Sequence, residues 1–136
     1  MGKGKGWLLN LGLLWLRLLM GAGIASHGYG KIFGGQVEAF SEGVAQLGLP
    51  FPLFFAWAAA LSEFVGGIFI ALGLGTRIAA LLVLVTMSVA AFLRHAADPF
   101  HVKELALAYW TMAGTLIFIG PGTLSLDGLF CKPKRE

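Results

Sequence analysis

Hydrophobic residues along this chain gather into four runs that are separated by short polar segments. The runs cover residues 7–26, 51–74, 78–93 and 105–119, and each approaches the ~20 apolar residues that a helix needs to cross ~30 Å of hydrocarbon. The third run is the shortest, so its helix is expected to include Thr76, Arg77 and Arg94, whose long side chains can reach back to the membrane surface. With their flanking residues, the runs predict helices at about 7–30, 51–74, 76–96 and 104–120.

The segment between the first two runs predicts a shorter helix. Its apolar residues recur at helical spacing, at Val37, Phe40, Val44 and Leu47. This pattern is typical of an amphipathic helix that lies in the membrane interface. We therefore predict an all-α fold: an integral membrane four-helix bundle, a single transmembrane domain over residues 1–136, with a short interfacial amphipathic helix between helices one and two.

The composition agrees with a chain whose main partner is the lipid bilayer. The 136 residues are 57% hydrophobic and 12% charged, whereas soluble domains have roughly a quarter of their residues charged. A single cysteine, Cys131, excludes an internal disulfide and the dithiol chemistry of thiol oxidoreductases, which needs cysteine pairs. Four aromatic residues are expected to lie in interface belts or to face lipid: Trp7, Trp57, Tyr109 and Trp110.

The positive charges predict an orientation in the membrane. Four crossings place six basic residues on one side: Lys3, Lys5, Arg77, Lys132, Lys134 and Arg135. The other side carries Lys31, Arg94 and Lys103. Because short cytoplasmic segments carry the excess of Lys and Arg, both termini are expected in the cytoplasm. The net charge of +3 is thus explained by topology, and no nucleic acid is expected as a partner.

Two charged residues, Arg17 and Glu63, lie close to the middle of their apolar runs. If the first two helices are antiparallel neighbours, both charges fall near the bilayer midplane. A lone charge there costs at least ~2.5 kcal/mol and normally finds a partner inside the bundle. We therefore predict an intramembrane ion pair between Arg17 and Glu63, which would either fix the helix register or form part of a proton path or cofactor pocket.

A second group of polar residues is dispersed in sequence but is expected to meet at the non-cytoplasmic ends of the helices. It consists of His27, Lys31, Arg94, His95, Asp98, His101, Lys103 and Glu104. Such residues at one mouth could bind a metal, exchange protons or donate hydrogen bonds to a quinone. Polar residues at helix ends also occur simply in water or among headgroups, and no spacing here matches a dedicated zinc site, so no metal is assigned.

Several motifs in this order resemble the DoxX family of small four-helix bacterial membrane proteins. They are Arg17 followed by H-G-x-x-K at residues 27–31, E-x-x-G-G at 63–67, L-G-x-x-T-R at 72–77, and G-P-G at 120–122 with a following S-x-D. The resemblance extends over residues 11–129. It implies a bacterial inner (plasma) membrane location and a link to redox chemistry, since family members are assigned as small subunits of quinol oxidases, thiosulfate:quinone oxidoreductases or other membrane oxidoreductase complexes.

The resemblance carries the family's polar residues onto Arg17, His27, Lys31, Glu63, His95 and Glu104. It favours an accessory or quinone-interacting subunit of an oxidoreductase complex, with His27, Lys31, His95 and Glu104 around a quinone or proton site. Electrons would come from a protein partner, and haem held by His27 and His95 is the less favoured cofactor. Catalysis by the chain alone, its substrate and a homo-oligomeric state stay open.

Two other functions are compatible with the sequence. One is a small proton-coupled transporter that uses Glu63 as its coupling residue, since small multidrug transporters also have four helices and one intramembrane carboxylate. The other is a membrane scaffold that recruits proteins and performs no chemistry.

Overall fold

The computed structural model describes residues 3–131 of the chain, without the side chains of Lys3 and Lys5. Two helices precede the α3–α4 hairpin: α1 (Lys3–Phe33) and α2 (Val37–Ala45). The hairpin consists of α3 (Pro52–Leu72) and α4 (Thr76–Ser88), and α4 continues as the π-helix η1 (Val89–Arg94). The chain closes with α5 (Phe100–Ile119) and α6 (Leu126–Phe130). The predicted Lys132, Lys134 and Arg135 charges lie outside the described residues.

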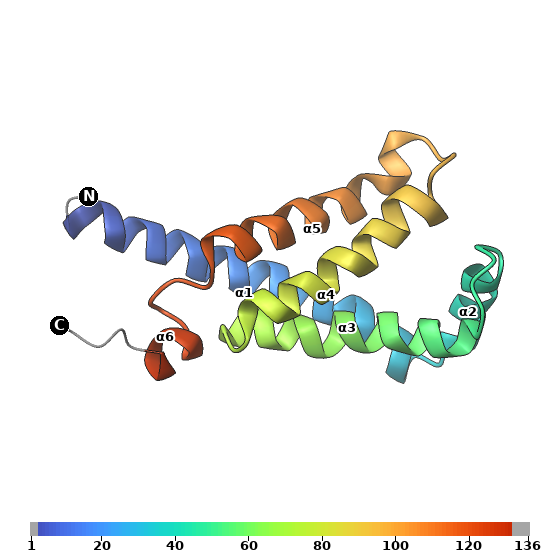
Figure 1. The fold of residues 1–136 in the computed structure, drawn as a ribbon, viewed down its shortest axis with the longest axis horizontal. Coiled ribbons are helices and arrows are strands. Elements are labelled where there is room, and N and C mark those ends of the chain that lie inside the picture. The colour runs from blue at the N-terminus through green and yellow to red at the C-terminus, as the bar shows by residue number, and fades with distance from the viewer. Residues whose placement is uncertain (1–2, 132–136) are drawn as a thin grey trace.

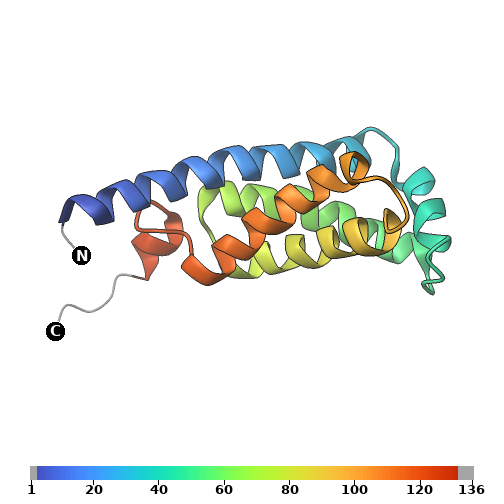
Figure 2. The same ribbon diagram turned by 90° about the horizontal axis from the view of Figure 1, so that it is seen from above.

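The all-α fold and its four crossings are confirmed. Four helical stretches are long and apolar enough to span a membrane: Gly6–Phe33, Pro52–Leu72, Thr76–Arg94 and Phe100–Ile119. The helices α1 and α3 pack against each other, and Figure 1 shows α1 crossing behind α3. The helices α4 and α5 run together and diverge from α3 toward the end of the bundle that carries α2 (Figure 1). Figure 2 shows the N-terminal part of α1 extending beyond the α3–α4 turn.

Glycines bring α1 and α3 into backbone contact. A Cβ atom at Gly21 would lie 2.5 Å from the carbonyl oxygen of Gly67 and 2.6 Å from the backbone nitrogen of Ala71. About two turns further along α1, Gly28 faces the backbone of Ala60 and Phe64 in the same way. Lipid tails are as apolar as leucine side chains, so helices in a membrane associate by such close packing. These contacts fix the register between the two helices.

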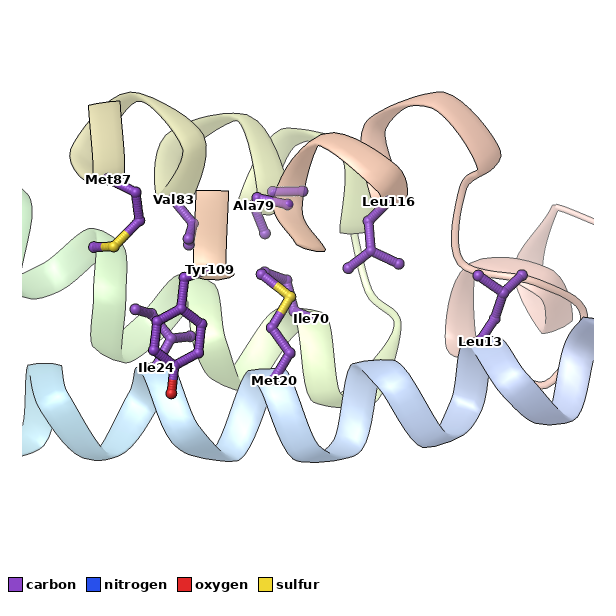
Figure 3. Close-up of a cluster of buried hydrophobic side chains, with 11 residues drawn as sticks. Leu13, Met20, Ile24, Ile70, Ala79, Val83, Met87, Tyr109 and Leu116 are labelled. Carbon is purple, nitrogen blue, oxygen red and sulfur yellow. The ribbon is translucent and has the colours of Figure 1, made fainter. Parts of the chain in front are cut away.

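The space between the two helix pairs is filled by apolar side chains. Met20 and Ile24 of α1 meet Ile70 of α3, Val83 of α4 and Leu116 of α5, as Figure 3 shows. All five are at most 2% exposed. The core therefore joins all four crossings on the side of the bundle where α3 and α4 are connected.

The short helix α2 exists where the sequence predicted it, but its apolar face packs against protein. Val37 and Val44 are buried against Ala56 and Ala60 of α3, with Phe40 beside them. The helix thus covers the end of the α1–α3 pair that is remote from the α3–α4 turn (Figure 1).

The segment after α5 folds back onto the α3–α4 turn. The two carboxylate oxygens of Asp127 accept hydrogen bonds from the backbone nitrogens of Gly75 (2.8 Å) and Thr76 (3.0 Å). Asp127 thereby caps the start of α4, where a negative charge is favoured. Burial alone would raise the pKa of Asp127, but the bonds from Thr76 and Gly75 and the nearby charge of Arg17 lower it overall.

The close contact of α1 with α3 can be tested by adding one methyl group. Gly21→Ala should lower the melting temperature of the detergent-solubilised protein, because the new Cβ overlaps the α3 backbone and overpacking costs about 1–3 kcal/mol. Gly12→Ala in the same helix is the matched control, since a Cβ there has no neighbour within 4 Å. Equal melting temperatures for the two variants would contradict the packing described here.

The Asp127 cap should also give the protein a defined pH dependence. Because folding lowers the pKa of this carboxyl group, its stabilisation is present at neutral pH and is lost as the pH falls below about 4. The difference in melting temperature between wild type and Asp127→Asn should therefore shrink on going from pH 7 to acid. Glu104→Gln, which changes an exposed carboxylate, should show no comparable narrowing.

Candidate functional site

Glu63 forms its ion pair with Lys31. The Lys31 Nζ atom lies 2.7 and 2.8 Å from the two carboxylate oxygens of Glu63 and donates a hydrogen bond to each. The Glu63 side chain is 3% exposed and that of Lys31 is 22% exposed. The same ammonium group lies 4.3 Å from the centre of the Phe40 ring, a cation–π contact with α2. Lys31 thus connects α1 to both α3 and α2.

The predicted pairing of Arg17 with Glu63 is wrong. Arg17 is 1% exposed and donates hydrogen bonds to the carbonyl oxygens of Ala71 (3.2 Å) and Leu124. Its guanidinium group therefore joins the end of α3 to the segment after α5. It helps to hold that segment, together with Asn10, whose side-chain oxygen accepts a bond from the Thr123 nitrogen.

The helix register explains the error. The midpoints of the two apolar runs do not lie at the same level, because α1 has 31 residues against 21 in α3 and its first part extends past the α3–α4 turn. With Gly21 packed on Gly67, Arg17 reaches the level of Ala71. Glu63 lies eight residues from Ala71 along α3, roughly 12 Å at 1.5 Å per residue, and the side chain of Lys31 reaches it from the opposite direction along α1.

A cavity of ≈ 670 Å³ lies beside the Lys31–Glu63 pair, within the range typical of small-molecule sites. Residues from α1, α2, α3, α4, η1 and α5 line it, and most of them are apolar. Its ionisable lining residues are His27, Lys31, Glu63, Arg94, His95 and Tyr109. Its lining residues on α3, α4 and α5 belong to the part of the bundle in which Figure 1 shows α4 and α5 diverging from α3.

Three of the four residues predicted for a quinone or proton site line this cavity. They are His27, Lys31 and His95. Glu104, the fourth, is exposed in the first turns of α5 and is absent from the cavity lining. The inward face of α5 instead carries Tyr109, Ala113 and Leu116, so Glu104 lies on a different side of the helix.

Tyr109 is a site residue that the sequence did not reveal. It was expected at the interface or facing lipid, yet it is 9% exposed and lines the cavity. Its hydroxyl group lies against Gly23 of α1, where any Cβ would collide with it, and its ring packs edge-on against His27 at 6.0 Å. The contact between Gly23 on α1 and Tyr109 on α5 cannot be predicted from the sequence pattern of either helix alone, because the two helices are far apart in the sequence.

The π-helix brings Arg94 and His95 to the cavity. The His95 nitrogen bonds to the carbonyl oxygen of Ala90, a separation of five residues that widens the last turn. π-Helical turns are frequently found at functional sites. His95 also contacts the carboxylate of Asp98 through its Nδ1 atom at 2.6 Å, which leaves its other ring nitrogen available.

The remaining residues of the predicted polar group lie outside the cavity. Asp98, His101 and Lys103 are absent from its lining. Lys103 donates a hydrogen bond to the carbonyl oxygen of Ala96 at 3.0 Å, so it closes the loop between η1 and α5.

Comparison with models of protein families gives a match that covers much of the chain. The DoxX family model matches residues 12–96, which is more than half of the chain. The chain belongs to the DoxX family. No curated protein and no solved structure matches it.

The DoxX match contains most of the residues described above. Arg17, His27, Lys31, Glu63 and His95 all lie within residues 12–96. It ends before Tyr109 and before Asp127. The resemblance seen in the sequence is thus confirmed, and the protein is a multi-pass membrane member of the family.

A double-mutant cycle distinguishes the two pairings of Glu63. Glu63→Gln alone should destabilise this DoxX protein by about 3–5 kcal/mol, because it leaves Lys31 without its partner in a buried site. The double variant with Lys31→Met and Glu63→Leu should lose clearly less free energy of unfolding than the sum of the losses in the two single variants. Arg17→Met and Glu63→Leu should be additive in the same unfolding assay, and strong coupling between Arg17 and Glu63 would contradict the structure.

Proposed function

We propose that this DoxX-family protein is an accessory, quinone-interacting subunit of a membrane oxidoreductase complex in the bacterial plasma membrane. The observation that carries the proposal is the cavity of ≈ 670 Å³, in which an apolar lining surrounds a few convergent polar groups. Sites for small apolar molecules typically have this composition. A quinone has a polar head and an apolar tail, so its two parts match the two kinds of lining.

The polar groups would act on the head of the quinone. His27 and Tyr109 lie side by side on α1 and α5, and both can donate a hydrogen bond to a carbonyl oxygen. His95 would approach from the end of η1. Lys31 and Glu63 form a hydrogen-bonded pair in which Lys31 could pass a proton to the head and recover it through Glu63. The quinone itself would supply the redox chemistry, with electrons from a partner protein.

The orientation in the membrane is part of the same proposal. The N-terminal end of α1 and the helix α6 lie at one end of the bundle (Figure 1), together with Arg77 at the start of α4. If this end faces the cytoplasm, as the distribution of Lys and Arg in the sequence favours, the cavity opens near the opposite face.

The proton-coupled transporter is the second candidate. It is favoured by one observation: Glu63 is a nearly buried carboxylate that lines a cavity. For coupling, Lys31 would have to release Glu63 during each cycle. A transporter of this kind would release protons when substrate is added, whereas a quinone-binding subunit would retain quinone on purification and a scaffold would do neither.

Gentle detergent extraction tests the proposed function. We expect lipid-soluble quinone and an oxidoreductase partner to co-purify with the wild-type protein. His27→Leu should lower the quinone content roughly threefold to tenfold, since one hydrogen bond contributes about 0.5–1.5 kcal/mol. His101→Leu is the matched control because His101 is exposed and outside the cavity lining. Recovery of neither quinone nor partner would contradict the proposal.

A further inference from the structure

The cavity offers hydrogen-bond donors and almost no acceptors among its charged groups. Glu63 is its one carboxylate, and both oxygens of Glu63 are bonded to Lys31. Because its side chain is only 3% exposed, Glu63 offers a ligand almost no free oxygen that could accept a hydrogen bond. A molecule whose head carries only acceptors is therefore the chemical match for this cavity.

Arg94 adds a positive charge that the described residues leave without a hydrogen-bond partner. Its guanidinium group lies against α2, where a Cβ at Gly43 would be 3.2 Å from Nε. It is exposed and lines the cavity, and among residues 3–131 it makes no hydrogen bond and no ion pair. A guanidinium group without a hydrogen-bond partner is suited to bind a carboxylate or a phosphate through two parallel hydrogen bonds.

The formal charges of the cavity lining also favour a ligand with a negative charge. Lys31 and Arg94 contribute two positive charges and Glu63 contributes one negative charge, which leaves an excess of one positive charge when the histidines are neutral. The other carboxylates of the described residues do not line the cavity, and one of them, Asp98, contacts His95. An anionic head would neutralise the excess charge in a setting where an unpaired charge is costly.

The apolar part of the lining is open to the surroundings of the bundle. Phe55, Leu82, Val85 and Leu105 line the cavity and are between 38% and 55% exposed. They lie within membrane-spanning stretches, whereas Arg94 is the last residue of its stretch. A ligand can therefore place its head at the membrane boundary and its tail in the hydrocarbon region.

From this arrangement we propose that the cavity binds a single-chain amphiphile with an anionic head, whose carboxylate or phosphate lies between Arg94 and Lys31. The volume of ≈ 670 Å³ suits one drug-sized molecule. The tail follows the apolar surface of α3 and α4 toward the lipid. The proposal needs no redox partner and so goes beyond the proposed function, and the amphiphile would compete with any quinone for the same space.

Binding to the full-length protein in phosphatidylcholine nanodiscs tests this proposal. The probe is isotope-labelled laurate, displaced by unlabelled laurate, dodecyl phosphate, 1-dodecanol or acetate. Laurate and dodecyl phosphate should both displace it, whereas 1-dodecanol, which has the same tail and no charge, should bind at least about tenfold more weakly. If acetate displaced the probe at a concentration similar to that of laurate, the cavity would be a site for small soluble anions, and the proposal of an amphiphilic ligand would be overturned. Equal binding of laurate and 1-dodecanol would overturn anion recognition.

Variants at two arginines separate the site from general charge effects. Arg94→Gln should weaken laurate binding about tenfold and leave 1-dodecanol unchanged, and Arg94→Lys should restore part of the loss. Arg77→Gln removes one positive charge outside this cavity and should change the binding of neither laurate nor 1-dodecanol. Unchanged laurate binding by Arg94→Gln, in protein with a wild-type melting temperature, would overturn the proposal. Laurate binding without recovery of quinone on extraction would contradict only the proposed redox role.

Discussion

The backbone contact between α1 and α3 is the constraint on which the rest of the structure depends. Gly21 and Gly67 allow the two helices to approach until main-chain atoms touch, and no other residue fits there. This contact sets which residues face one another along the whole pair. It places Lys31 beside Glu63 and leaves Arg17 at the opposite end of α3. A shift of one turn, about 5.4 Å, would move both side chains away from these partners.

The register divides the polar residues between two ends with different properties. At the end of the α3–α4 turn, Arg17 and Asp127 bond to backbone groups, so the chemistry of these side chains is used to fix the chain. At the other end, Lys31 and Glu63 neutralise each other while Arg94 remains exposed. The helices diverge only there, which is why a cavity lined by ionisable groups can exist beside a tightly packed core.

The sequence predicted the parts of this arrangement that depend on one helix at a time. The four crossings and α2 followed from apolar periodicity, and three of the polar residues at the helix ends, His27, Lys31 and His95, line the cavity. The partner of Glu63 could not be predicted in this way, because it depends on the sliding of α1 along α3. Tyr109 was missed and Glu104 misplaced for a similar reason: the rotation of α5 about its axis is decided by packing against α1 and α4.

The cap on α4 has a consequence for the assembly of the protein during synthesis. The group that satisfies the first nitrogens of α4 lies 51 residues further along the chain, on Asp127. Because chains are made from the N-terminus, α1 and α3 can pack as soon as both are in the membrane, whereas the start of α4 waits until Asp127, which follows α5, has left the ribosome. Synthesis of the segment that carries Asp127, and not insertion of the fourth crossing, is therefore the event that finishes this end of the bundle.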